Sequence, residues 1–140
     1  MTTLNQNKSD FEQWLKSLPP EEYELFVVGW SFGTELALQY ARDKRIKELI
    51  LLSPPMLSTT DEDLDFWIKD GRRITALIPE LDDYLKPEAA KIKFAKVKNL
   101  KQIDVNGAKH LWVGEPMVHL VLSEIVRIIA PDKLPLATEI

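Results

Sequence analysis

The sequence predicts an α/β fold, with a parallel, doubly wound sheet of about four strands and flanking helices. Two observations predict it. Continuous apolar runs such as Leu25–Val28 have the composition of strands that are buried on both faces of a sheet. Between these runs the apolar residues recur at helical spacing, so strands and helices alternate, which favours right-handed crossovers between parallel strands.

The first half of the chain is predicted to hold two helices and two strands. A first helix is indicated by the spacing of its apolar residues, and two prolines end it. A buried strand, a crossover helix, a second strand and a rigid exit loop follow. In order, these elements are Phe11–Leu18 with Pro19 and Pro20, then Leu25–Val28, Gly33–Arg42, Ile46–Leu52 and Ser53–Pro55.

The second half is predicted to hold three helices and two strands. Thr60 followed by Asp63 is the start signal of a short acidic helix, which Gly71 can close in a left-handed conformation. A long final helix begins near Pro116, because proline suits a first helical turn. Between these two helices we expect a strand, a crossover helix and a strand at Arg73–Ile78, Pro87–Val97 and Lys101–Val105.

Composition and charge indicate one globular domain over residues 1–140 and argue against several functions. The chain is 45% hydrophobic and 29% charged, with a net charge of -4 in stretches of mixed sign. We therefore expect no nucleic-acid partner, and interpret the basic cluster Lys86–Lys101 as the solvated face of a helix. The chain has no cysteine, and no metal or other cofactor is implied.

No apolar run approaches the roughly 18 residues of a membrane span, so we expect no membrane partner and a cytoplasmic protein.

The segment from Glu24 to Ala41 carries the main chemical signal. An apolar strand, the turn Gly29-Trp30-Ser31-Phe32-Gly33 and an amphipathic helix follow one another directly. This order is typical of a nucleophile elbow, in which a sharp turn exposes a serine hydroxyl above the edge of a sheet. Ser31 is therefore the candidate nucleophile.

A base and an acid follow Ser31 in the chain. The loops that leave the carboxyl ends of parallel strands converge on one edge of the sheet. Of the two histidines, His119 falls within the final helix, whereas His110 lies in the loop after the last strand, so His110 is the candidate base. The loop after the third strand contains Asp82 and Asp83 as candidate acids.

These motifs resemble the α/β-hydrolase superfamily. The resemblance rests on Gly29–Gly33, on Asp82–Pro87 and on Gly107–His110 in the order serine, acid, histidine, and it covers nearly the whole chain. The stretches Leu51–Pro55 and Lys109–Glu115 are similar to small bacterial hydrolase-like proteins of unassigned substrate. The family commonly places its acid four residues before a proline. That implies Asp83, with Asp82 as the second choice.

The resemblance implies a serine hydrolase acting on a small ester, thioester or amide. His110 would take the proton of Ser31, and Asp83 would orient the imidazole ring. The Phe32 amide would donate to the oxyanion, while the side chains of Trp30 and Phe32 would shape the pocket.

Each assignment also has a simpler interpretation. Ser31 fits a plain turn serine, His110 a solvated loop histidine, and the two aspartates a charge cluster at a helix N-terminus. Apolar packing beside the turn accounts for Trp30 and Phe32.

The resemblance covers only the C-terminal half of the family's domain. We expect the N-terminal strands to be missing, together with the loop that supplies a second oxyanion amide. The strand Leu25–Val28 would then have a bare edge, which predicts self-association or a partner chain. Three hypotheses remain open, namely a serine hydrolase, a catalytically silent binding module, and a fragment that needs a partner half.

Overall fold

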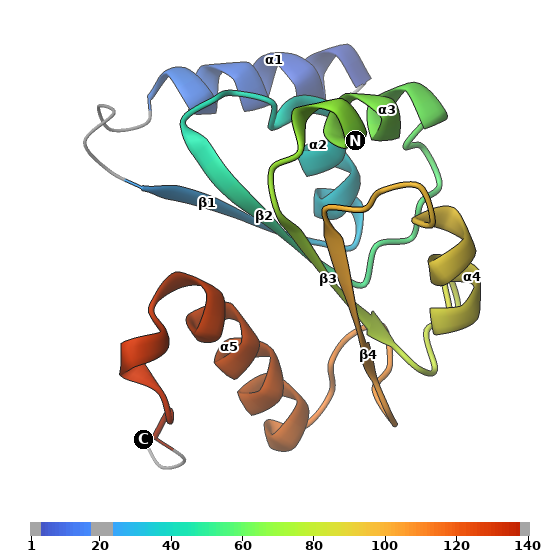
Figure 1. Cartoon of the computed structure of the whole chain (residues 1–140), viewed down its shortest axis with the longest axis vertical. Helices are drawn as coiled ribbons and strands as arrows, with labels where there is room; N and C mark the ends of the chain where they lie inside the picture. The colour runs from blue at the N-terminus through green and yellow to red at the C-terminus, as the bar shows by residue number, and fades with distance from the viewer. Residues whose placement is uncertain (1–3, 18–23, 138–140) are drawn as a thin grey trace.

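The computed structural model describes residues 4–17 and 24–137, and its core is a sheet of four parallel strands (Figure 1). The strands are β1 (Leu25–Trp30), β2 (Ile46–Leu52), β3 (Ile74–Pro79) and β4 (Leu100–Val105). Their order in the sheet is β1-β2-β3-β4, and every neighbouring pair is parallel. The predicted α/β class and parallel sheet are confirmed.

Helices cover both faces of the sheet. They are α1 (Leu4–Lys16), α2 (Phe32–Tyr40), α3 (Asp61–Asp70), α4 (Pro87–Lys93) and α5 (Glu115–Ile129), with a short 3-10 turn at Pro131–Lys133. Because the strand order never reverses, crossovers of one hand place α2, α3 and α4 on the same face. α1 joins them there, and α5 lies on the opposite face (Figure 1).

Each face has its own apolar core. The larger core lies under α1 to α4 and includes the fully buried Leu38, Trp67 and Ile78. The smaller core lies under α5 and is centred on Ile50 and Leu77. Alternate residues of β2 and β3 therefore enter different cores, which explains the continuous apolar runs Leu49–Leu52 and Ala76–Ile78.

The ends of α3 follow the sequence prediction. The Thr60 hydroxyl accepts a hydrogen bond from the Asp63 amide at 3.2 Å, and the Asp63 carboxylate accepts one from the Thr60 amide at 2.9 Å. This reciprocal pair is the capping box that the sequence predicts. Gly71 ends the helix with φ of 80°, in the left-handed region.

Three helix boundaries differ from the prediction, and α2 ends at Tyr40 rather than Arg42. α1 begins at Leu4, whereas the prediction began it at Phe11. The first turns were missed because they are polar and show no apolar period in the sequence. α4 ends at Lys93 rather than Val97, although Val97 is buried beyond its end. The predicted end of the first helix at Leu18 and Pro19 lies outside the described residues.

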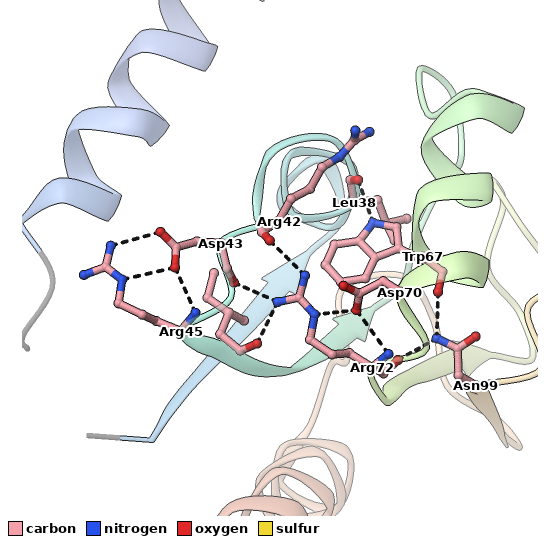
Figure 2. Close-up of polar contacts among 9 residues, drawn as sticks. Leu38, Arg42, Asp43, Arg45, Trp67, Asp70, Arg72 and Asn99 are labelled. Atoms are coloured by element: carbon pink, nitrogen blue, oxygen red, sulfur yellow. Dashed lines mark hydrogen bonds and ion pairs between the residues drawn. The ribbon is translucent and has the colours of Figure 1, made fainter. Parts of the chain in front are cut away.

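Arg72 connects several backbone segments at the edge of the sheet where the strands begin (Figure 2). Its guanidinium group donates to the backbone carbonyls of Arg42, Asp43 and Ile46, and to the carboxylate of Asp70. These contacts join the end of α3 to the loop between α2 and β2. The opposite edge, at the carboxyl ends of the strands, is left for the candidate site.

Candidate active site

Ser31 lies in the sharp turn between β1 and α2 and has an unusual backbone conformation. Its φ is 53° and its ψ is -119°, a strained combination for a residue with a side chain. The Ser31 amide donates to the Leu52 carbonyl of β2, and the Ser31 carbonyl accepts from the Thr34 amide, both at 2.9 Å. The surrounding backbone thus holds the strained turn in place.

Only the first glycine of the motif is required by close packing. A Cβ atom on Gly29 would lie 2.6 Å from the carbonyl oxygen of Gly33 and 2.8 Å from its carbonyl carbon. The helix therefore starts so close to β1 that no side chain fits there. A Cβ on Gly33 would meet no atom within 4 Å.

Three side chains from three strand ends form a continuous hydrogen-bonded chain. The Ser31 Oγ atom lies 2.7 Å from Nε2 of His110, and Nδ1 of His110 lies 2.8 Å from Oδ2 of Asp82. Ser31 follows β1, Asp82 follows β3 and His110 follows β4, so they meet at the shared carboxyl edge of the sheet. Asp82 is fully buried, and the His110 side chain is 16% exposed.

The acid in contact with His110 is Asp82, which corrects the prediction of Asp83. Asp83 is exposed, and the contact expected of it is made by its neighbour. The reason is the turn after β3, where Oδ1 of Asp82 accepts the Tyr84 amide at 2.7 Å. This bond folds the Asp82 side chain inward and turns its Oδ2 toward the imidazole. Asp82 lies five residues before Pro87, one more than the spacing used for the prediction.

The arrangement allows proton transfer from Ser31 to His110. A carboxylate only accepts hydrogen bonds, so Oδ2 of Asp82 selects the tautomer of His110 that carries its proton on Nδ1. The lone pair of Nε2 then faces the Ser31 hydroxyl. His110 can therefore accept the serine proton while the buried carboxylate balances the charge that forms on the ring.

Trp30 and Phe32 flank Ser31 at the surface and are 48% and 49% exposed. The Trp30 indole Nε1 donates to the backbone carbonyl of His110 at 3.2 Å, so this residue contacts the histidine loop directly. Phe32 is the first residue of α2, where a backbone N–H has no acceptor within its own helix. The helix dipole adds positive potential at this position, which suits an oxyanion.

Ser53 is a site residue that the sequence analysis missed. It directly follows β2, is fully buried, and donates from Oγ to the His110 carbonyl at 3.0 Å. The sequence indicated only a rigid loop at Ser53–Pro55. The one available signal was the position of Ser53 at the carboxyl end of a strand, on the same edge as Ser31.

Neither a cluster of metal-ligating side chains nor a membrane-spanning helix is found within the described ranges 4–17 and 24–137. No group of three or more His, Asp or Glu side chains there is arranged to hold a metal ion. No helix in that part of the chain has the length and apolar character needed to cross a membrane.

Comparisons with known proteins give structural matches only. No model of a known protein family matches the sequence, and no curated protein sequence matches it. An α/β serine hydrolase homologue from Coxiella burnetii superposes with a TM-score of 0.68 at 16% identity, over 89% of this chain and 58% of that one. A cold-adapted esterase from an Arctic intertidal metagenomic library gives 0.66 at 22% identity, over 87% and 57%. Est1E from Butyrivibrio proteoclasticus, with ferulic acid bound, gives 0.67 at 18% identity, over 95% and 70%.

These similarities cover nearly all of this chain but not all of the matched proteins. The chain spans 58% and 57% of the length of the first two. At such identities the match concerns the fold, and it agrees with the parallel sheet and its flanking helices. The chain has an α/β-hydrolase-like fold.

Proposed function

We propose that this chain is a serine hydrolase that cleaves a small ester, thioester or amide. Ser31 is the nucleophile, His110 the general base and Asp82 the acid that orients it. The observation that carries the proposal is the continuous chain from Ser31 Oγ through both nitrogens of His110 to Asp82, with contacts of 2.7 and 2.8 Å. The strained turn at Ser31 and the structural likeness to a serine hydrolase homologue and to esterases support it.

The reaction proceeds through two acyl transfers. Ser31 Oγ forms a bond to the substrate carbonyl carbon while Nε2 of His110 takes the hydroxyl proton. The bond to the leaving group then breaks, and His110 returns the proton to that group. Water repeats the sequence on the acyl-serine, which releases the acid and restores the Ser31 hydroxyl.

The negative charge on the carbonyl oxygen needs donors that are already in place. The Phe32 amide at the start of α2 is such a donor, because no atom of its helix accepts from it. One donor of this kind contributes about 10²- to 10³-fold in rate in other hydrolases. The Phe32 amide therefore belongs to the proposed site through its backbone, independently of its side chain.

Labelling with a fluorophosphonate probe tests the nucleophile. The probe phosphonylates an activated serine, so the wild-type chain should be labelled and Ser31→Ala should not. Ser123→Ala is the matched control, since it removes a serine hydroxyl from α5 that contacts His119 rather than the site. Equal labelling of wild type and Ser31→Ala would refute the proposal.

Turnover of p-nitrophenyl acetate and butyrate separates an enzyme from a silent binding module. Wild type and Ser123→Ala should hydrolyse these esters at equal rates, and Ser31→Ala and His110→Ala should not. Labelling without turnover would refute a hydrolase acting on simple esters, and turnover that survives Ser31→Ala would refute the nucleophile.

A further inference from the structure

We propose that Ser53 is a positioning residue for His110, and that its buried hydroxyl fixes the histidine backbone so that the imidazole stays within reach of Ser31. This inference rests on the proposed role of His110 as the base. It assigns to β2 a part in the site, although β2 contributes none of the three reacting side chains.

The His110 carbonyl is held by two donors. The Ser53 hydroxyl donates to it at 3.0 Å, and the Trp30 indole N–H donates to it at 3.2 Å. A carbonyl oxygen has two lone pairs, so these two bonds use its full capacity. Ser53 is fully buried whereas Trp30 is 48% exposed, and the buried bond is better shielded from competing water.

The backbones of Ser31 and His110 are both hydrogen-bonded to the carboxyl end of β2. Trp30 pairs with Leu52 in the register of β1 and β2. The Leu52 carbonyl accepts from the Ser31 amide, and the very next residue, Ser53, donates to the His110 carbonyl. The end of β2 therefore holds the backbone of both partners, which sets the separation between the serine hydroxyl and the imidazole.

The backbone of Ser53 is in a conformation that favours glycine. Its φ is 52°, in the left-handed region, and its amide donates to the Leu77 carbonyl of β3 at 3.0 Å. A side chain is strained at this φ, so glycine would be the easier residue for the turn alone. Unlike glycine, serine can donate a side-chain hydrogen bond to the His110 carbonyl from this position.

The loop that carries His110 has other anchors closer to β4. The Leu81 amide donates to the Ala108 carbonyl, and the Gly107 amide donates to the Glu80 carboxylate, both at 2.9 Å. These bonds do not involve Ser53. Loss of its hydroxyl should therefore displace His110 while the loop stays docked.

The test uses two substitutions that share the loss of the hydroxyl but differ in strain. Ser53→Ala keeps a side chain at the strained φ, whereas Ser53→Gly relieves the strain, so their free energies of unfolding should differ. Both should lower the maximal rate of fluorophosphonate labelling about tenfold or more, because small misplacements of a reacting group are costly. The concentration for half-maximal labelling rate should stay unchanged, and Ser123→Ala should match wild type in both constants.

The labelling result separates positioning from a purely structural role. Equal losses in the two variants, despite unequal unfolding free energies, support the inference. A labelling rate that follows unfolding free energy across the two variants would overturn it, as would rates equal to wild type.

A second measurement does not depend on catalysis. The measurement follows by NMR the Nδ1 proton that His110 donates to Asp82 in the full chain, and Ser53→Ala should speed the exchange of this proton with water relative to wild type and Ser123→Ala. If the wild-type chain fails to label, the proposed function fails, and this exchange rate still tests the Ser53 contact. An unchanged exchange rate in Ser53→Ala would refute it.

Discussion

Replacing Asp82 with asparagine should slow the reaction of Ser31 by several orders of magnitude while the chain stays folded. Oδ1 of Asp82 accepts the amides of Tyr84 and Leu85, and Oδ2 accepts from Nδ1 of His110. Asparagine can keep its oxygen on the two amides and so preserve the turn after β3. Its NH2 group then faces the imidazole, where it selects the tautomer with the proton on Nε2. That tautomer points an N–H at Ser31 and cannot take the serine proton.

The expected loss in rate is about 10⁴-fold, the cost of the same change in a serine protease with a Ser-His-Asp triad, where the wrong tautomer is also the cause. That loss corresponds to about 5.4 kcal/mol of transition-state stabilisation, at about 1.36 kcal/mol per factor of ten. The cost in folding is much smaller. The three hydrogen bonds of Asp82 persist as neutral ones, and removing a buried charge offsets part of their weakening, so the free energy of unfolding should fall by no more than about 1.5 kcal/mol.

Asp83→Asn is the matched control for this change. Asp83 is adjacent, carries the same carboxyl group and is exposed, so its labelling rate should stay within about twofold of wild type. The assay is the rate of fluorophosphonate labelling of each variant, with the unfolding free energy of each measured in urea. A large loss in Asp83→Asn with wild-type rates in Asp82→Asn would refute the assignment of the acid. Wild-type rates in both would refute a role for either carboxylate.

Three further predictions concern the fold and the surface. Gly29→Ala should lower the free energy of unfolding, measured in urea, by about 1–3 kcal/mol, because the new Cβ would meet the Gly33 carbonyl. Gly33→Ala should not destabilise the chain, and equal losses in the two variants would contradict the close approach of α2 to β1. The hydrogen bond from Arg72 holds the pKa of Asp70 below its ordinary value of 3.8. The contribution of this pair to stability is therefore fully present above about pH 5 and is lost as the pH falls below 3.8 through the lowered pKa. Asp70→Asn should flatten that acid limb in thermal melts, and an unchanged limb would refute the pairing. Among the described residues β1 pairs only with β2, and the β1 residue Val28 is 43% exposed. The chain should therefore self-associate at tens of micromolar, and Val28→Lys should reduce the self-association measured by light scattering. A monomeric wild type would refute the expectation.

The sheet could be predicted because burial on two faces leaves a clear mark in the sequence. A strand such as β2 is covered on both sides over Leu49–Leu52, and this stretch is a continuous apolar run. The rule that parallel strands share a carboxyl edge then predicted that Ser31 and His110 would lie near each other. In the structure, the Ser31 Oγ atom lies 2.7 Å from Nε2 of His110.

The choice between two adjacent aspartates could not be made from spacing. Asp82 and Asp83 differ by one position, and the direction of each side chain depends on the turn between β3 and α4. The bond from the Tyr84 amide decides it, and that bond exists only once the turn has formed. Ser53 escaped prediction for a similar reason, because its contact with His110 spans 57 residues and its left-handed backbone leaves no mark in the sequence.

The order of the strands has a consequence for synthesis on the ribosome. Each strand pairs with the next one in the chain, so the sheet can be assembled in the order in which it is translated. Ser31 precedes His110 by 79 residues, which at about 5–20 residues per second leaves the Ser31 hydroxyl without its hydrogen-bond partner for about 4–16 s. Under the proposed function, hydrolysis becomes possible only after the loop that follows β4 has brought His110 to Ser31.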